Sequence, residues 1–281
     1  MATTQTERKK EALLDSLKKF EKAAVAFSGG VDSSFLAYVA REALGEDAVA
    51  LTVVSPLLSG EEYEDALSLA RTIGIRHVLV EMDELQDPLF AANPADKCYI
   101  CKKERFSAME KWARERDIQW LLDGSNADDL ADYRPGMKAL AENPFVRSPL
   151  LEAGLAKAEI RQLSRDLGLF TWNKPARACL ASRIPYGETI TREKLQKIEQ
   201  AETFLASFLP PKSQFRVRVH DDVARIEADM KELLPLLSPD MTGRIHDELT
   251  RMGFRYVTLD LKGYRMGSLN EALSSDTEKG K

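Results

Sequence analysis

The sequence predicts an α/β protein whose main domain is a doubly wound parallel sheet, followed by a smaller α+β domain. Two observations support this fold class. Continuous apolar runs at 23–27 and 48–54 alternate with segments of helical periodicity, as expected for strands that a parallel sheet buries on both faces. A glycine-rich turn joins the first of these strands to the next helix, which is where open α/β sheets bind ligands.

The elements of the main domain alternate between helix and strand along the chain. Leucines and a phenylalanine recur at helical spacing over 8–20, ahead of the first strand. Ser59 and Glu62 have the spacing of a capping box and predict that a helix begins there. The stretch 133–149 is rich in proline and glycine and predicts a loop. The other predicted elements are strands at 77–81 and 120–123 and helices at 31–43, 59–73, 102–116 and 155–167.

The C-terminal part of the chain predicts a small α+β domain. An apolar stripe of helical spacing over 195–208 precedes two alternating segments, 215–220 and 223–228, that we expect to pair through the turn at Asp221-Asp222. Two helices and a last strand complete this domain, at 230–237, 239–252 and 254–261. The expected organisation is a main domain over 1–172, a functional linking loop over 173–190, a small domain over 191–274 that binds substrate or mediates assembly, and a disordered tail over 275–281.

Composition restricts the class of protein. Of the 281 residues, 44% are hydrophobic and 30% are charged, as in globular proteins with a well-filled core. The net charge of −5 argues against nucleic acid as a partner. Residues 1–19 lack the apolar core of a secretory signal, and no apolar run has the length of a membrane span. We therefore expect a cytoplasmic protein with no membrane partner.

The glycine-rich turn has the sequence Ser-Gly-Gly-Val-Asp-Ser-Ser over 28–34. Glycines let the backbone approach a ligand closely, and the amide groups and positive dipole end of the next helix favour phosphate. The lysine of a Walker A loop is missing, and the string resembles the pyrophosphate-binding loop of the ATP pyrophosphatases, which cleave ATP to AMP and pyrophosphate. The alternative is a strand–helix turn without a ligand. The residues expected to bind ATP are Ser28, Gly29, Gly30, Asp32, Ser33, Ser34, Thr52, Val53 and Gly124.

Some of these residues have a more specific expected role. Asp32 is a candidate ligand of Mg²⁺ beside pyrophosphate, and the alternative is a carboxylate that the helix dipole stabilises. Thr52 and Val53 lie at the end of a predicted strand and are expected to border adenine, although Val53 equally suits the core. Gly124 ends the fourth predicted strand and would let AMP approach the backbone.

The chain has three cysteines, and two of them form a C-x-x-C pair. The pair is Cys98 and Cys101, and the third cysteine is Cys179. In a reducing compartment such a pair indicates metal binding or redox chemistry. Structural zinc normally takes four protein ligands, and the three histidines are scattered. Three thiolates can hold a [4Fe–4S] cluster and leave one iron open, whereas clusters usually take four cysteines. The alternative is one buried cysteine and an incidental pair.

Two arginines of the small domain suggest an anion site. Arg216 and Arg218 are two residues apart on a predicted strand, so both side chains leave the same face. Paired guanidinium groups suit bidentate binding of phosphate or carboxylate. The alternative is a solvated strand face with Glu227 opposite. Ser182 and Arg183, which follow Cys179, are further candidates to hold a substrate phosphate.

Taken together, five motifs resemble the LarE family over nearly the whole chain, roughly residues 13 to 273. They are the turn at 28–34, the C-x-x-C ahead of a helix, and the segments 124–136, 174–187 and 260–268. The first motif is shared by many ATP pyrophosphatases, and the later ones are more restrictive. Members of this family are ATP-dependent sulfur transferases that build the nickel-pincer nucleotide cofactor of lactate racemase and related enzymes.

The resemblance implies a specific reaction. ATP would adenylate a ring carboxylate of pyridinium-3,5-biscarboxylic acid mononucleotide, and a sulfur nucleophile would displace AMP to give a thiocarboxylate. In members with only the cysteine that matches Cys179, that residue gives up its own sulfur. This chain also has Cys98 and Cys101 and resembles the subgroup in which three cysteines hold a [4Fe–4S] cluster whose open iron carries a sulfide. The resemblance further implies Mg²⁺, an external sulfide or sulfur donor, and a homo-oligomer, with a hexamer as the candidate form.

Other functions remain open on the sequence alone. A tRNA thiolase of the same superfamily would adenylate a base and insert sulfur, but no added RNA-binding module or zinc-type cysteine pairs are visible. An amidotransferase-type ATP pyrophosphatase would leave the cysteines unexplained. A non-catalytic iron–sulfur or nucleotide-binding module would leave the combined set of motifs unexplained.

Overall fold

The computed structural model describes residues 5–131, 135–175, 178–211 and 213–270. The chain forms two compact units: the first consists of Met1–Glu84 and Cys98–Arg177, and the second of Leu85–Lys97 and Ala178–Lys281. The segment Leu85–Lys97 therefore belongs to the second unit, although it lies within the range predicted for the main domain. The predicted disordered tail at 275–281 lies outside the described residues, as do positions 132–134 and 176–177 of two sequence motifs.

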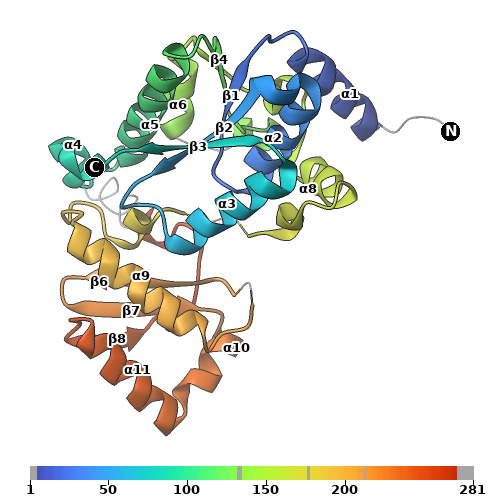
Figure 1. Ribbon diagram of the computed structural model, residues 1–281. Helices are drawn as coiled ribbons and strands as arrows, with labels where there is room; N and C mark the ends of the chain where they lie inside the picture. Colours follow the sequence, from blue (N-terminus) through green and yellow to red (C-terminus); the bar gives the residue numbers. More distant parts are fainter. Residues whose placement is uncertain (1–4, 132–134, 176–177, 212, 271–281) are drawn as a thin grey trace, which may run out of the picture. The chain divides into compact units, whose positions relative to one another are not determined.

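The first unit is built on a five-stranded parallel sheet with strand order β3-β2-β1-β4-β5 (Figure 1). The order reverses between β1 and β4, so the carboxyl ends of these two strands form the switch point at which such sheets bind ligands. This sheet confirms the predicted fold class. The strands are β1 (Ala23–Ala26), β2 (Ala48–Val54), β3 (Arg76–Glu81), β4 (Trp120–Leu122) and β5 (Val146–Arg147).

Helices cover both faces of this sheet because successive strand side chains point to opposite sides. Ala23 and Val25 of β1 pack into one hydrophobic core with α1, α2, α3 and α8, whereas Ala24 packs into another with α5 and α6. Ser59 and Glu62 form the predicted capping box at the start of α3. The helices are α1 (Gln5–Leu17), α2 (Val31–Leu44), α3 (Gly60–Ile73), α5 (Lys97–Arg114), α6 (Pro135–Ala141), α7 (Pro149–Glu152) and α8 (Lys157–Asp166).

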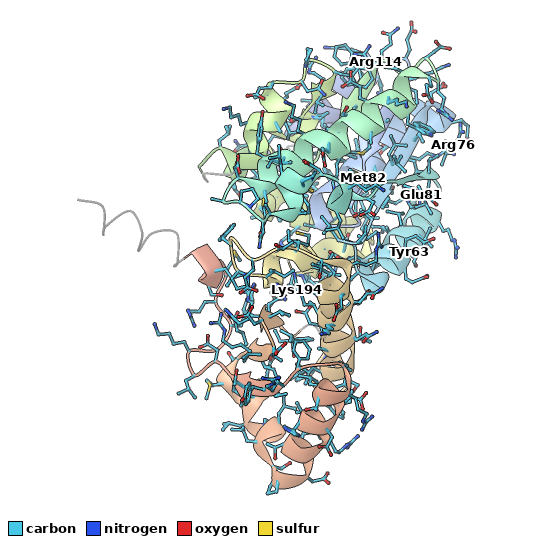
Figure 2. The ribbon with its side chains drawn as sticks, turned by 90° about the vertical axis from the view of Figure 1, so that its left-hand side faces the viewer. Tyr63, Arg76, Glu81, Met82, Arg114 and Lys194 are labelled. Atoms are coloured by element: carbon cyan, nitrogen blue, oxygen red, sulfur yellow. The ribbon has the colours of Figure 1, made fainter. Side chains whose placement is uncertain are left out.

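The edge strand β3 is more exposed than β2. Figure 2 labels its two ends, Arg76 and Glu81, and both charged residues are exposed. Charged side chains at a sheet edge discourage pairing with another chain. No helix in the described ranges is both long enough and apolar enough to cross a membrane.

Two sequence predictions need correction. The helix predicted to begin at 102 begins at Lys97, so Cys98 and Cys101 lie inside its first turns and not ahead of it. The stretch predicted as a loop contains α6 and the two-residue strand β5. Leu140 and Phe145 anchor this stretch in the core, and a strand of two residues is too short to show a period in the sequence.

The second unit contains a three-stranded mixed sheet with strand order β6-β7-β8. Strands β6 (Phe215–His220) and β7 (Val223–Ala228) pair antiparallel as predicted, and β8 (Tyr256–Leu259) runs parallel to β7. The predicted apolar stripe of α9 (Arg192–Ala206) is buried, as its residues Leu195, Ile198 and Leu205 show. The remaining helices are α4 (Pro88–Ala91), α10 (Met230–Leu233) and α11 (Pro239–Arg251), with single 3₁₀ turns that include η5 (Leu180–Arg183).

Candidate functional site

The turn between β1 and α2 has the geometry of an anion-binding loop. Gly29 is left-handed, with φ 67°, and Gly30 is the extended N-cap residue of α2. The first helical hydrogen bond runs from the Ser34 N–H to the Gly30 carbonyl, at 3.0 Å. The amides of the three preceding residues, 31–33, therefore have no acceptor within the helix, and they point at the space in front of the turn.

The three predicted serines hold this turn together. The Ser28 N–H donates to Ser33 Oγ at 3.2 Å, and the two hydroxyl oxygens lie 3.1 Å apart. The hydroxyls of Ser33 and Ser34 both donate to the Gly30 carbonyl, at 3.2 and 2.5 Å. The turn is thus rigid before any ligand arrives, which lowers the entropy cost of binding.

The structure places Gly124 directly against this turn. Gly124 follows β4, and a Cβ atom at this position would lie 3.1 Å from the Ser33 backbone nitrogen. Since 3.1 Å is closer than most side-chain carbons approach, a larger residue at position 124 would push against the backbone of the turn. The turn and Gly124 meet at the switch point of the sheet, where the two strands β1 and β4 end.

The side chains of Thr52 and Val53 are buried in β2. The Thr52 hydroxyl donates to the Phe27 carbonyl at 2.7 Å and lies 2.8 Å from His77 Nε2. A hydroxyl has one proton to donate, so His77 must donate through Nε2–H. Burial lowers the pKa of His77 below its ordinary value, which agrees with a neutral ring.

Asp32 carries the atom in the turn that is best suited to a cation. Its Oδ2 accepts a hydrogen bond from the Lys157 ammonium, whereas its Oδ1 is buried and has no hydrogen-bond partner among the described residues. Burial raises the pKa of Asp32, while the nearby Lys157 acts in the opposite direction. A buried carboxylate oxygen without a donor fits a bound divalent cation, since Mg²⁺ takes oxygen ligands and is usually held by one or two carboxylates.

Two lysines that the sequence analysis did not identify flank the turn. Lys157 begins α8, and Lys174 follows the 3₁₀ turn at Phe170–Asn173. The Lys174 ammonium donates to the Gly29 carbonyl at 3.1 Å and pairs with Asp65 at 2.8 Å. The position of Lys174 at the head of the 174–187 motif was a usable signal, but nothing in the sequence links Lys157 to Asp32.

The pair Cys98 and Cys101 projects from one side of α5, because residues three apart are neighbours on a helix. Cys98 is exposed and Cys101 half-buried, and neither forms a disulfide. Cys101 Sγ lies 3.9 Å from the carboxylate of Glu84, which is fully buried and also accepts a hydrogen bond from Arg105 at 2.7 Å. Two thiols on one helix face suit the donor chemistry of an iron–sulfur cluster.

The third cysteine belongs to the second unit. Cys179 is half-buried, outside any disulfide, and caps the 3₁₀ turn η5. Within the described ranges, no group of three or more histidine, cysteine or acidic side chains is arranged to hold a metal. The convergence of the three cysteines on one cluster therefore stays a prediction.

The side chain of Arg183 forms hydrogen bonds with the backbone around Cys179. It is 5% exposed, and its Nη1 donates to the carbonyls of Ala178 and Cys179 and to Ser182 Oγ. Its other two nitrogens donate to the Glu202 carboxylate at 3.0 and 2.8 Å. Arg183 thus holds the Cys179 segment against α9.

Arg216 and Arg218 differ in the hydrogen bonds that they form within the protein. Arg218 donates twice to Glu227, at 3.1 and 3.0 Å, and once to the Ser182 carbonyl, at 2.7 Å. Arg216 stacks over the Tyr264 ring at 5.1 Å, and its one hydrogen bond within the described residues is to the carbonyl of Phe215. Burial lowers the pKa of Arg216, and repulsion from Arg183 adds to this effect. Arg216 therefore has the capacity to bind an anion that Arg218 lacks.

The closing motif at 260–268 supports this arginine pair. Gly263 has φ 66°, and a Cβ there would lie 2.6 Å from the Ala228 carbonyl, so only glycine fits. The Tyr264 N–H donates to the same carbonyl at 3.1 Å, which brings its ring under Arg216. Ser268 lies 3.1 Å from Arg218 and 3.2 Å from Glu227.

Comparisons with known proteins agree with this architecture. A family model described as NAD synthase matches residues 7–119, which include the turn and the first three strands. An uncharacterized protein of Synechocystis is 44% identical over 268 residues, 94% of this chain and 99% of the relative. An uncharacterized protein of Methanocaldococcus jannaschii is 27% identical over 249 residues, 88% of this chain and 92% of the relative.

A further relative has a named activity. The pyridinium-3,5-bisthiocarboxylic acid mononucleotide synthase of Lactiplantibacillus plantarum is 39% identical over 275 residues, which cover 98% of this chain and 97% of that enzyme. Identity at this level over both whole chains leaves no large part of either protein unmatched. The chain therefore belongs to the family of pyridinium-3,5-bisthiocarboxylic acid mononucleotide synthase, the LarE family, which confirms the resemblance found in its motifs.

Proposed function

We propose that the protein is an ATP-dependent sulfur transferase that converts carboxylates of pyridinium-3,5-biscarboxylic acid mononucleotide into thiocarboxylates, with AMP and pyrophosphate as co-products. The observation that carries this proposal is the turn at 28–34: its helix N-terminus suits phosphate, and Asp32 beside it keeps one buried oxygen without a donor. The name of the Lactiplantibacillus plantarum relative supports the substrate class, since that enzyme makes the bisthiocarboxylic product.

The first half-reaction activates the substrate. The amides of the α2 N-terminus would hold the phosphates of ATP, and the ammonium groups of Lys157 and Lys174 would neutralise the charge that develops on pyrophosphate. A ring carboxylate oxygen attacks the α-phosphorus, and the bond from that phosphorus to the bridging oxygen breaks. Mg²⁺, held by Asp32, would supply charge neutralisation on the phosphate oxygens when bound.

The second half-reaction introduces sulfur. A hydrosulfide-type nucleophile attacks the carbonyl carbon of the acyl adenylate, and the bond to AMP breaks to leave the thiocarboxylate. Cys98, Cys101 and Cys179 are the residues that would hold a [4Fe–4S] cluster, which when bound would supply a sulfide on its open iron. The role of this chain's own residues is to hold the Cys179 segment in place, through Arg183 and Arg218.

The substrate itself is an anion, and Arg216 is the side chain best placed to bind it. Its guanidinium is nearly buried and carries few internal bonds, so a phosphate or carboxylate there would gain charge-assisted hydrogen bonds. Ser182 and Arg183 belong to the segment that follows Cys179, and they would shape the site around the anion.

The test is the release of AMP and pyrophosphate in the presence of the mononucleotide substrate. Gly30→Val should abolish it, because Gly30 is extended and a Cβ there would lie near one side-chain atom, Ser28 Oγ at 3.3 Å, whereas the added side chain would occupy the position proposed for phosphate. Gly243→Val is the matched control, since Gly243 is exposed and has no neighbour within 4 Å. Release of ADP and phosphate, or activity retained in Gly30→Val, would contradict the proposal.

A further inference from the structure

Asn93 lies at the centre of a set of hydrogen bonds in the second unit. It is fully buried and adopts a left-handed conformation, with φ 57°. Its side-chain nitrogen faces three carbonyls, those of Pro185 at 2.6 Å, Glu188 at 3.0 Å and Ile184 at 3.3 Å. One amide side chain therefore organises a whole turn of the segment that follows Cys179.

Backbone bonds reinforce the same arrangement. The Gly187 N–H donates to the Asn93 carbonyl at 3.0 Å, and the Ile190 N–H donates to the Ala91 carbonyl at 2.8 Å. The residues that accept these bonds belong to Leu85–Lys97, the short segment that joins the second unit from within the first. The turn over 184–190 is thus wrapped around this segment.

Lys97 extends these bonds toward Cys179. Lys97 is 4% exposed, and its ammonium donates to Asn93 Oδ1 at 2.5 Å and to the Ala181 carbonyl at 3.3 Å and lies 4.5 Å from the centre of the Tyr186 ring. Ala181 belongs to η5, whose N-cap residue is Cys179. Burying an ammonium group has a large desolvation cost, so its retention here calls for a reason other than packing.

The covalent position of Lys97 supplies that reason. Lys97 is bonded directly to Cys98 and is the first residue of α5. Lys97, the residue directly before the C-x-x-C, is therefore hydrogen-bonded to the segment that carries Cys179. Two ion pairs hold the same segment to α9: Arg183 pairs with Glu202, and Lys194, labelled in Figure 2, pairs with Glu188 at 3.1 Å.

We propose that Asn93 and Lys97 are positioning residues for the sulfur-transfer step: they hold the segment 178–190 in one conformation and tie it to the residue that precedes Cys98. This inference rests on the proposed function, and it concerns only the second half-reaction. Loss of either side chain leaves the ATP-binding turn intact but frees the Cys179 segment to open.

The variants are Asn93→Gly and Lys97→Met. Glycine accepts the left-handed conformation of Asn93 and removes only its side-chain bonds, and methionine keeps the length of lysine without its charge. Asp117→Gly is the matched control for the first, because Asp117 is also left-handed, at φ 55°, and is exposed. Lys138→Met is the control for the second, because 74% of the Lys138 side chain is exposed.

Three quantities are measured on the full-length protein: alkylation of Cys179 by iodoacetamide, hydrogen exchange of the Gly187 and Ile190 amides, and sulfur transferred per pyrophosphate released. In both variants we expect alkylation and exchange to rise about tenfold, the ratio that corresponds to about 1.4 kcal/mol. In a single turnover, pyrophosphate release should keep its wild-type rate, while sulfur transferred per pyrophosphate falls by a similar factor because water hydrolyses the acyl adenylate that sulfur does not reach. A purely structural role would instead lower both half-reactions together.

The inference is overturned if the variants fold and all three quantities match those of the controls, or if pyrophosphate release falls as much as sulfur transfer. Should Asn93→Gly fail to fold, Asn93→Asp replaces it, since aspartate keeps the acceptor for Lys97 and loses the donor to the three carbonyls. Absence of pyrophosphate release from the wild-type protein would refute the proposed function; the exchange and alkylation measurements would still decide whether Asn93 and Lys97 hold the Cys179 segment.

Discussion

Asp32 and Lys157 form an ion pair across 125 residues of the sequence, and it joins the glycine-rich turn at 28–34 to the first turn of α8. The pair engages only one carboxylate oxygen, while the other is buried and, in the part of the chain that the structure describes, has no hydrogen-bond partner. Asp32 therefore pairs with one cation through Oδ2, and its Oδ1 is an oxygen of the kind that Mg²⁺ prefers as a ligand. This arrangement suits a site that must bind a highly charged anion together with its metal ion.

Lys157→Met should weaken ATP binding, because it removes an ammonium group that we propose neutralises the phosphates and leaves Asp32 without its counter-charge. The expected loss is about 1.5–3 kcal/mol, or roughly 10- to 150-fold in the dissociation constant. Isothermal titration with ATP and Mg²⁺ measures it, and Lys138→Met serves as the control. An unchanged dissociation constant would show that Lys157 serves only the stability of the fold.

Alanine substitutions at the two glycines of the turn should have different effects, one mainly on the stability of the fold and the other mainly on ATP binding. Gly29 is left-handed and faces the backbone of Ala66 at 3.4 Å, so Gly29→Ala should destabilise the folded protein by about 1–2 kcal/mol. Gly30 is extended, so Gly30→Ala should leave the free energy of unfolding, measured with urea, within about 0.5 kcal/mol of wild type yet weaken ATP binding. Equal effects of both changes on stability would argue against this division.

Arg216 and Arg218 should also respond differently. Arg216→Gln should weaken substrate binding by about 1.5–3 kcal/mol and barely change stability. Arg218→Gln should destabilise the second unit by about 3 kcal/mol, because it removes a partner of the fully buried Glu227. Hydrogen exchange of the β6 amides reports the stability and substrate titration the affinity. Loss of affinity without loss of protection in Arg218→Gln would assign it a direct binding role.

His77 should make stability depend on pH. Because burial lowers its pKa in the folded protein, the unfolded chain binds a proton first as the pH falls below about 6.5. Its contribution is thus fully present above pH 6.5 and is lost between that value and the lowered pKa. Urea midpoints at about pH 7.5 and 5.5 should differ less in His77→Gln than in wild type. His246→Gln, at an exposed position, is the control. If the urea midpoint changes equally with pH in wild type, His77→Gln and His246→Gln, His77 is not the cause of the pH dependence.

Much of the first unit could be predicted because its signals are local. The apolar run of β2, the capping box at Ser59 and the glycine pair of the turn each depend on residues close in sequence, and their elements lie where expected. The predicted pairing of β6 with β7 had the same origin, since a short turn fixes the register.

The contacts that were missed at the candidate site and around Asn93 join residues distant in sequence. Nothing local indicates that Lys157 meets Asp32, or that Asn93 inserts its side chain into a turn more than 90 residues away, at Ile184 and Glu188. The same holds for the assignment of Leu85–Lys97 to the second unit, which its backbone bonds to that turn explain. The predicted ligand roles of Thr52, Val53 and the three cysteines remain predictions.

The central claim is that ATP cleavage to AMP drives repeated transfer of sulfur to the mononucleotide without loss of the sulfur of Cys179. The most direct measurement is intact-protein mass spectrometry after anaerobic reaction with ATP, Mg²⁺, substrate and sulfide, with the thiocarboxylate product counted in the same sample. We predict an unchanged protein mass and more than one sulfur transferred per chain. Loss of one H₂S from Cys179, with no more than one sulfur transferred per chain, would contradict this account and show that Cys179 is consumed as the sulfur donor.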